Sequence, residues 1–144
     1  MRNKSILLIE DDELDVISVQ RSLNKIGGDH RLFTAYNGIE ALSILKGEGE
    51  MDKNELPDII LLDINMPKMN GIEFLQELRK NKKFDNIRIF VMTTSNEEND
   101  RVATEKLGVS GYYIKPLNFN DNNKSYSSMD SFMQFYISQI LEKR

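Results

Sequence analysis

Four short apolar runs in this chain are each followed by polar side chains that could take part in chemistry. In chain order, these side chains are Glu10, Asp11 and Asp12, then Asp63, then Thr93, and finally Lys115. If the runs are parallel strands of one sheet, their carboxyl ends meet at one edge, where open α/β sheets bind ligands. The sequence therefore predicts a single site that contains several carboxylates, a hydroxyl and an ammonium.

Carboxylates gathered in this way need a proton or a cation. Two of them about 4 Å apart repel each other by about 4 kcal/mol at an effective dielectric near 20. The predicted cluster offers only oxygen ligands, which suit a hard ion such as Mg²⁺. Mg²⁺ beside a nucleophilic carboxylate is what phosphoryl transfer requires, because catalysis there is mostly positioning and charge neutralisation. We therefore expect Asp63 to form an aspartyl phosphate, with Lys115 and Thr93 contacting the phosphoryl oxygens.

The elements that would position these residues alternate along the chain. Continuous apolar runs at residues 6–9, 59–62 and 87–92 are typical of strands buried on both faces. Weaker strand candidates are residues 31–36 and 111–114. Helical patterns are found at residues 14–26, 39–46, 72–79, 97–107 and 129–141. In the first of these helices, Leu14, Ile17 and Leu23 mark the expected buried face.

This alternation predicts an α/β protein with a doubly wound, five-stranded parallel sheet and right-handed crossovers. Polar stretches at residues 47–57 and 118–128 interrupt the pattern, but neither has the character of a domain boundary. We expect a single domain over residues 1–144, with a core at about 4–117 and a C-terminal loop and helix at 118–144.

Composition excludes several classes of function. The net charge of −4 gives no reason to expect nucleic acid or an anionic membrane as a partner, because both are bound by basic patches. The apolar residues 6–9 near the N-terminus are too few for a signal peptide or a membrane span. The chain has no cysteine, which excludes disulfides and is compatible with a reducing compartment. We expect a cytoplasmic protein with no nucleic-acid or membrane partner.

Four segments resemble the receiver domain of bacterial two-component response regulators, in that family's order and spacing. They are ILLIEDDE, PDIILLDINMPKMNG, VMTTS and GYYIKP, and together they span nearly all of residues 4–116. The resemblance is to single-domain, chemotaxis-type regulators. It implies the flavodoxin-like (βα)5 fold with strand order 2-1-3-4-5.

The resemblance also implies roles for the acidic residues. Asp63 is the phosphoacceptor and a Mg²⁺ ligand, Asp11 is a direct ligand, and Glu10 acts through water. The backbone carbonyl of Asn65 is a further ligand. One alternative remains open: Asp12 could replace Glu10 in the acidic pair, or it could simply cap the following helix.

The remaining roles implied by the resemblance concern the phosphoryl group and the response to it. Thr93 and Lys115 contact the phosphoryl group, Thr93 and Tyr112 are the switch residues, and the bond between Lys115 and Pro116 is cis. Tyr113 alternates to the other face of its strand, where we expect it to pack.

The implied function is that of a stand-alone response regulator. A sensor histidine kinase would phosphorylate Asp63, and the output would be a protein contact made by the fourth helix, fifth strand and fifth helix. Such a protein is not an enzyme in the usual sense, because it promotes only its own phosphorylation and dephosphorylation.

The long loop before the third strand and the C-terminal extension resemble regulators paired with phytochrome-type kinases, several of which dimerise. The last helix carries more apolar residues than a narrow stripe requires, and we predict that they form either core or a partner or dimer surface. These residues are Phe132, Met133, Phe135 and Tyr136.

Two other functions remain open. One is a receiver-like binding module that is never phosphorylated. The other is a phosphohydrolase with an aspartyl-phosphate intermediate, but those enzymes carry a second Asp two residues after the nucleophile. Here that position is Asn65, which cannot transfer protons.

Overall fold

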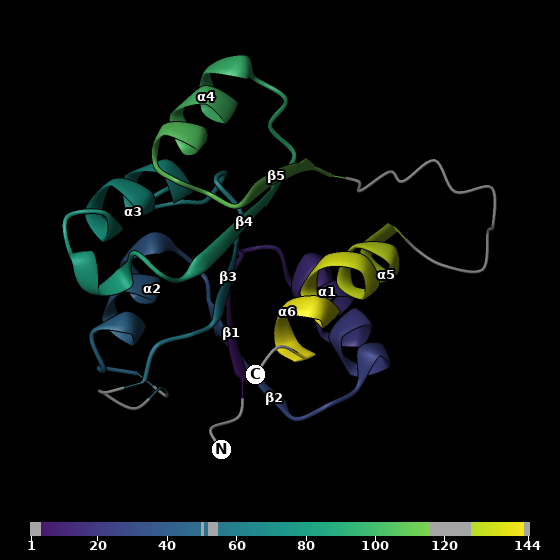
Figure 1. Ribbon diagram of the computed structural model, residues 1–144. Coiled ribbons are helices and arrows are strands. Elements are labelled where there is room, and N and C mark those ends of the chain that lie inside the picture. Colours follow the sequence, from purple (N-terminus) through teal and green to yellow (C-terminus); the bar gives the residue numbers. More distant parts are fainter. Residues whose placement is uncertain (1–3, 50, 52–54, 116–127, 143–144) are drawn as a thin grey trace.

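The computed structural model describes residues 4–49, 51, 55–115 and 128–142. Its strands are β1 (Lys4–Ile9), β2 (His30–Ala35), β3 (Ile59–Leu62), β4 (Arg88–Thr93) and β5 (Gly111–Ile114). All neighbouring strands pair in parallel, in the order β2-β1-β3-β4-β5 (Figure 1). The predicted fold class and strand order are therefore confirmed.

Helices cover both faces of this sheet. Those before β5 are α1 (Glu13–Ile26), α2 (Gly38–Leu45), α3 (Gly71–Leu78), the 3-10 turn η1 (Lys82–Phe84) and α4 (Glu98–Lys106). In Figure 1, α2 and α3 lie on one side of the sheet, while α1, α5 (Ser128–Phe132) and α6 (Ser138–Glu142) lie on the other. Within the described ranges, no helix combines the length and the apolar character that a bilayer crossing requires.

The central strands are uninterrupted runs of apolar residues because both faces of the sheet are buried there. In β1, Leu7 and Ile9 belong to the hydrophobic cluster that also holds the α2 and α3 side chains. Ile6 and Leu8 belong to the cluster on the α1 side. The edge strands β2 and β5 are only partly buried, which explains why their sequences gave the weaker strand signals.

The predicted buried face of α1 is wrong in part. Leu14 is 76% exposed and Ile17 is 42% exposed, whereas Val16 and Val19 are buried together with Leu23. Both sets have helical spacing, so periodicity alone could not decide which of two adjacent stripes faces the sheet. The stripe that begins at Val16 packs against the α1-side cluster.

The last helix differs from the single helix predicted. It consists of α5 (Ser128–Phe132), a π-helical turn η2 (Met133–Ile137) and α6 (Ser138–Glu142). A π turn closes i→i+5 bonds, and it brings Phe132 and Ile137 to the same buried side. Phe132 and Met133 are core residues, whereas Phe135 and Tyr136 are 61% and 41% exposed.

The revised face of α1 gives a stability prediction. We expect Leu23→Ala to lower the free energy of unfolding by about 2–5 kcal/mol, because it leaves a cavity in the core. Leu14→Ala is the matched control, with an expected change within about 0.5 kcal/mol. Urea denaturation of both variants measures these changes in the free energy of unfolding. Equal losses in the two variants would show that Leu14 lies on the buried face of α1, as the sequence predicted.

Candidate functional site

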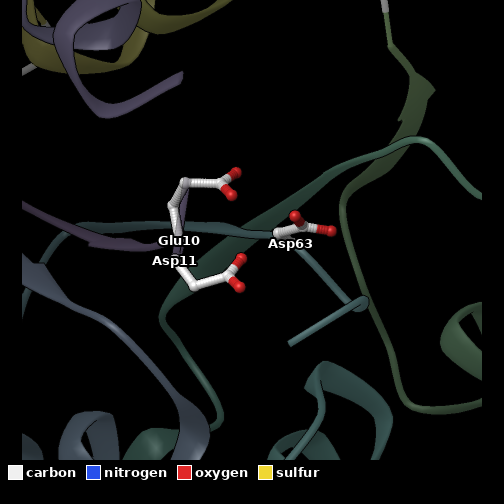
Figure 2. Close-up of side chains that lie close together, drawn as sticks. All are labelled: Glu10, Asp11 and Asp63. Carbon is white, nitrogen blue, oxygen red and sulfur yellow. The ribbon is translucent and has the colours of Figure 1, made fainter. Parts of the chain in front are cut away.

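Three carboxylates converge at the carboxyl ends of β1 and β3. Glu10 and Asp11 directly follow β1, and Asp63 directly follows β3. These strands are adjacent, with Ile9 opposite Leu62 in the register. Each of the three acids offers an oxygen that lies within 4.8 Å of the others. Figure 2 shows their side chains close together. The structure brings together the acids that sequence analysis assigned to one site.

The backbone around Asp63 is held firmly. Its N–H donates to the carbonyl of Ile9 at 3.0 Å, and its carboxylate accepts from the backbone N–H of Asn65 at 3.0 Å. The turn that follows passes so close that a Cβ at Gly71 would lie 2.6 Å from the Cα of Ile64. This close approach requires glycine, so the turn fixes the position of the acid that precedes it.

Asp12 and Glu10 occupy different environments at the start of α1. Asp12 is the N-cap residue, because its carboxylate accepts a hydrogen bond from the backbone N–H of Leu14 at 2.9 Å. Glu10 is only 2% exposed and belongs to the cluster with Asp63. This geometry favours Glu10 over Asp12 as the second acid of the pair.

Burial raises the pKa of the Glu10 carboxyl to about 7; hydrogen bonding to Lys115 lowers it, and the neighbouring Asp63 charge raises it. A cation beside this group would favour the ionised form. Burial and the Asp63 charge therefore raise the pKa of Glu10 by more than Lys115 lowers it.

Lys115 approaches the cluster from the end of β5. Its Nζ lies 2.5 Å from a Glu10 oxygen, 2.8 Å from Asp15 and 3.6 Å from Asp63. Burial acts to lower the pKa of this ammonium, but its hydrogen bonds to Asp15 and Glu10, together with the charges of Asp63 and Glu10, outweigh that effect and raise the pKa above the ordinary lysine value. Lys115 is therefore a fixed positive charge beside Asp63. The predicted cis bond to Pro116 lies outside the described residues.

Asp15 is a residue that sequence analysis missed. It lies in the first turn of α1, where an acid is ordinarily explained by the helix dipole. Its partner Lys115 is 100 residues away along the chain, so no local pattern links the two. Only the tertiary arrangement reveals the contact.

Thr93 ends β4 with its side chain fully buried. Its hydroxyl oxygen accepts hydrogen bonds from the side-chain amide of Asn65 at 3.3 Å and from the backbone N–H of Ser95 at 3.2 Å. The Asn65 amide also donates to the hydroxyl of Thr94 at 3.2 Å. Thr93 thus adjoins Asp63 through Asn65, and its own hydrogen can be directed toward an incoming group. The metal-ligand role of the Asn65 carbonyl stays a prediction.

The two tyrosines of β5 point to opposite faces. Tyr112 packs against the α2–α3 side and donates its hydroxyl to the backbone carbonyl of Ser95 at 3.0 Å. Tyr113 packs on the other side, against Phe132 at a ring-centroid distance of 4.8 Å. Tyr112 is therefore tied to the loop that follows Thr93, where a switch residue would need to be. Its movement stays a prediction.

The chemistry of this donor set fits a divalent cation. At separations below 5 Å, each pair of ionised carboxylates repels by about 3–4 kcal/mol at an effective dielectric near 20. Glu10 and Asp63 are buried, so solvent screens their charges poorly, while Asp11 is exposed at the rim. Oxygen donors with one solvent-facing side match the coordination habits of Mg²⁺, which keeps several waters.

Comparisons with a family model, with known sequences and with solved structures agree. The family model of the response regulator receiver domain matches residues 6–126. The response regulator Rcp1 of Synechocystis sp. (strain ATCC 27184 / PCC 6803 / Kazusa) is 37% identical over 129 residues, which cover 90% of this chain and 88% of Rcp1.

Two solved structures share the fold over nearly their whole length. The phosphorylated cyanobacterial phytochrome response regulator RcpA matches with a TM-score of 0.80 and 31% identity, over 96% of this chain and 96% of RcpA. The Mn²⁺-bound form of Rcp1 matches with a TM-score of 0.80 and 35% identity, over 98% of this chain and 96% of that one.

The repulsion among the carboxylates gives a second prediction. In EDTA, Asp11→Asn should raise the thermal midpoint by a few degrees, because it removes one of the clustered charges. It should also abolish or sharply reduce the increase that Mg²⁺ produces in the wild type, since a ligand that binds only the folded state stabilises it. Differential scanning calorimetry measures both effects.

Asp12→Asn is the matched control for this experiment. It removes the same charge one residue away and keeps a good N-cap, so the Mg²⁺-induced increase should persist. A full Mg²⁺ response in Asp11→Asn would show that Asp11 is not a ligand.

Proposed function

Because the chain belongs to the response regulator receiver family, we propose that it is a stand-alone regulator that accepts a phosphoryl group on Asp63. The observation that carries this proposal is the position of the Asp63 carboxylate. It lies close to the carboxylates of Glu10 and Asp11 and 3.6 Å from the Lys115 ammonium, which also contacts Glu10. That environment suits a nucleophile that attacks an anionic phosphoryl group.

The phosphoryl donor in this proposal is a phosphohistidine of a sensor histidine kinase. An Asp63 carboxylate oxygen forms a bond to phosphorus, while the bond from phosphorus to the histidine nitrogen breaks. The bonding electron pair stays on that nitrogen, and because the other ring nitrogen of the phosphohistidine carries a proton, the leaving group is neutral imidazole. The product is an aspartyl phosphate, and Lys115 and Thr93 donate hydrogen bonds to its phosphoryl oxygens.

Mg²⁺ is the proposed cofactor. When bound, it neutralises the charge of the acids and of the phosphoryl oxygens. Asp11, Asp63 and the Asn65 carbonyl would hold it directly, with Glu10 acting through water. The solved Mn²⁺-bound form of the similar protein Rcp1 supports this assignment.

Phosphorylation adds a charge of about −1.5 to −2 and new acceptor oxygens. Thr93 moves toward these oxygens and gives up its bonds from Asn65 and Ser95. Tyr112, now hydrogen-bonded to the Ser95 carbonyl, then moves inward. A local change in charge thereby alters the surface formed by α4, β5 and the last helix.

The output of this single receiver domain is a protein contact in the cytoplasm. The chain promotes its own phosphorylation and dephosphorylation and has no other substrate. The similarity to RcpA, a cyanobacterial phytochrome response regulator, supports a phytochrome-type kinase as the donor. The net charge of −4 speaks against nucleic acid or an anionic membrane as partner.

A small-molecule phosphodonor tests the central step. With Mg²⁺, we expect wild type to gain the mass of one phosphoryl group, and Asp63→Asn to gain none, because an amide is a poor nucleophile. Asp12→Asn is the control and should react like wild type. Intact-protein mass spectrometry gives the answer, and undiminished phosphorylation of Asp63→Asn would refute the assignment.

The same experiment separates the alternatives. A binding module that is never phosphorylated would show no mass gain in wild type. Steady turnover of a generic phosphate ester would instead favour a phosphohydrolase, although Asn65 occupies the position where those enzymes need an acid.

The exposed residues of the last helix supply a fourth prediction. Phe135 and Tyr136 lie on η2 with much of their side chains in solvent, and we propose that this face binds a second copy of the chain. Sedimentation velocity with and without beryllofluoride should then detect a dimer that Phe135→Ser weakens. A strict monomer in both states contradicts the dimer.

A further inference from the structure

We propose that Asp15 is a positioning residue that holds Lys115 in the unphosphorylated protein and competes with the phosphoryl group for it. This inference rests on the proposed phosphorylation of Asp63. It adds a residue that tunes the phosphoacceptor site without belonging to its acidic cluster, which among the described residues comprises Glu10, Asp11 and Asp63.

The distances around the ammonium support this inference. Lys115 Nζ donates to Asp15 at 2.8 Å, but its distance to Asp63 is 3.6 Å, beyond a good hydrogen bond. A second hydrogen bond, at 2.5 Å, goes to Glu10. Two of the three ammonium hydrogens are thus engaged by acids other than the phosphoacceptor.

Asp15 is placed to act as a competitor rather than as a component of the buried site. Its side chain is 36% exposed, whereas that of Lys115 is 10% exposed. The helix that carries it is fixed, because Val16 and Val19 are buried against the sheet. Asp15 therefore remains at the rim when Lys115 turns toward another partner.

The exchange of partners follows from charge. A phosphoryl group on Asp63 carries more negative charge than a single carboxylate, so Lys115 would leave Asp15 for the phosphoryl oxygens. Loss of the Asp15 charge removes the competing partner before this step. Since partly exposed ion pairs contribute little, the expected effect is about threefold to fivefold.

Beryllofluoride with Mg²⁺, a non-covalent mimic of the phosphoryl group, provides the test. Asp15→Asn should bind beryllofluoride about threefold to fivefold more tightly than wild type, as followed by titration of the backbone amide signals. Asp15→Glu keeps the charge and should remain close to wild type. Asp12→Asn removes a nearby charge that does not contact Lys115, so its effect should be clearly smaller.

A second readout needs neither Mg²⁺ nor phosphorylation. In the metal-free protein, the hydrogens of the Lys115 ammonium should exchange with solvent faster in Asp15→Asn than in wild type, because one of their acceptors is weakened. NMR of the nitrogen-15-labelled ammonium measures this rate. Asp12→Asn should leave it unchanged.

The outcomes distinguish this inference from the proposed function. If the wild-type protein binds no beryllofluoride, the proposed function is contradicted. The competition between Asp15 and the phosphoryl group for Lys115 then fails with it. Wild-type binding that Asp15→Asn leaves unaltered, or that Asp12→Asn tightens equally, overturns the role of Asp15 alone.

Discussion

The structure depends on one electrostatic constraint: carboxylates from two separate strands are held within 5 Å of one another in a partly buried site. Their mutual repulsion must be offset by positive charge. Lys115 supplies part of it, since its Nζ lies 2.5 Å from Glu10 and 3.6 Å from Asp63. In the proposed function, a divalent cation and a phosphoryl group would bind this site together, since each compensates the charge of the other.

The parallel sheet makes this unfavourable arrangement possible. β1 and β3 are adjacent and buried on both faces, so the two apolar clusters hold their carboxyl ends in place against the repulsion. The close passage of Gly71 past Ile64 fixes the turn after Asp63. Packing throughout the domain thus maintains a local concentration of like charge, which leaves the site responsive to whatever binds there.

The sequence predicted those features of the molecule that follow from the pattern of apolar and polar residues. Residues 6–9 and 59–62 are uniformly apolar because both strand faces are covered, and Asp63 could be located because parallel strands end at one edge. The sequence did not predict features that depend on tertiary contacts. The spacing in α1 suited Leu14 as well as Val16, and the contact between Asp15 and Lys115 joins residues 100 positions apart. The π-helical turn at Met133–Ile137 was not predicted either, and both of these residues are buried in the α1-side cluster.

The most direct test is a Mg²⁺ titration of the metal-free protein, followed through the backbone and carboxylate NMR signals. The account predicts saturable shifts centred on Asp11, Asp63 and Asn65, with smaller changes at Lys115 and none at the opposite edge of the sheet. Signals of Asp11 and Asp63 that stay unmoved at saturating Mg²⁺ would contradict it.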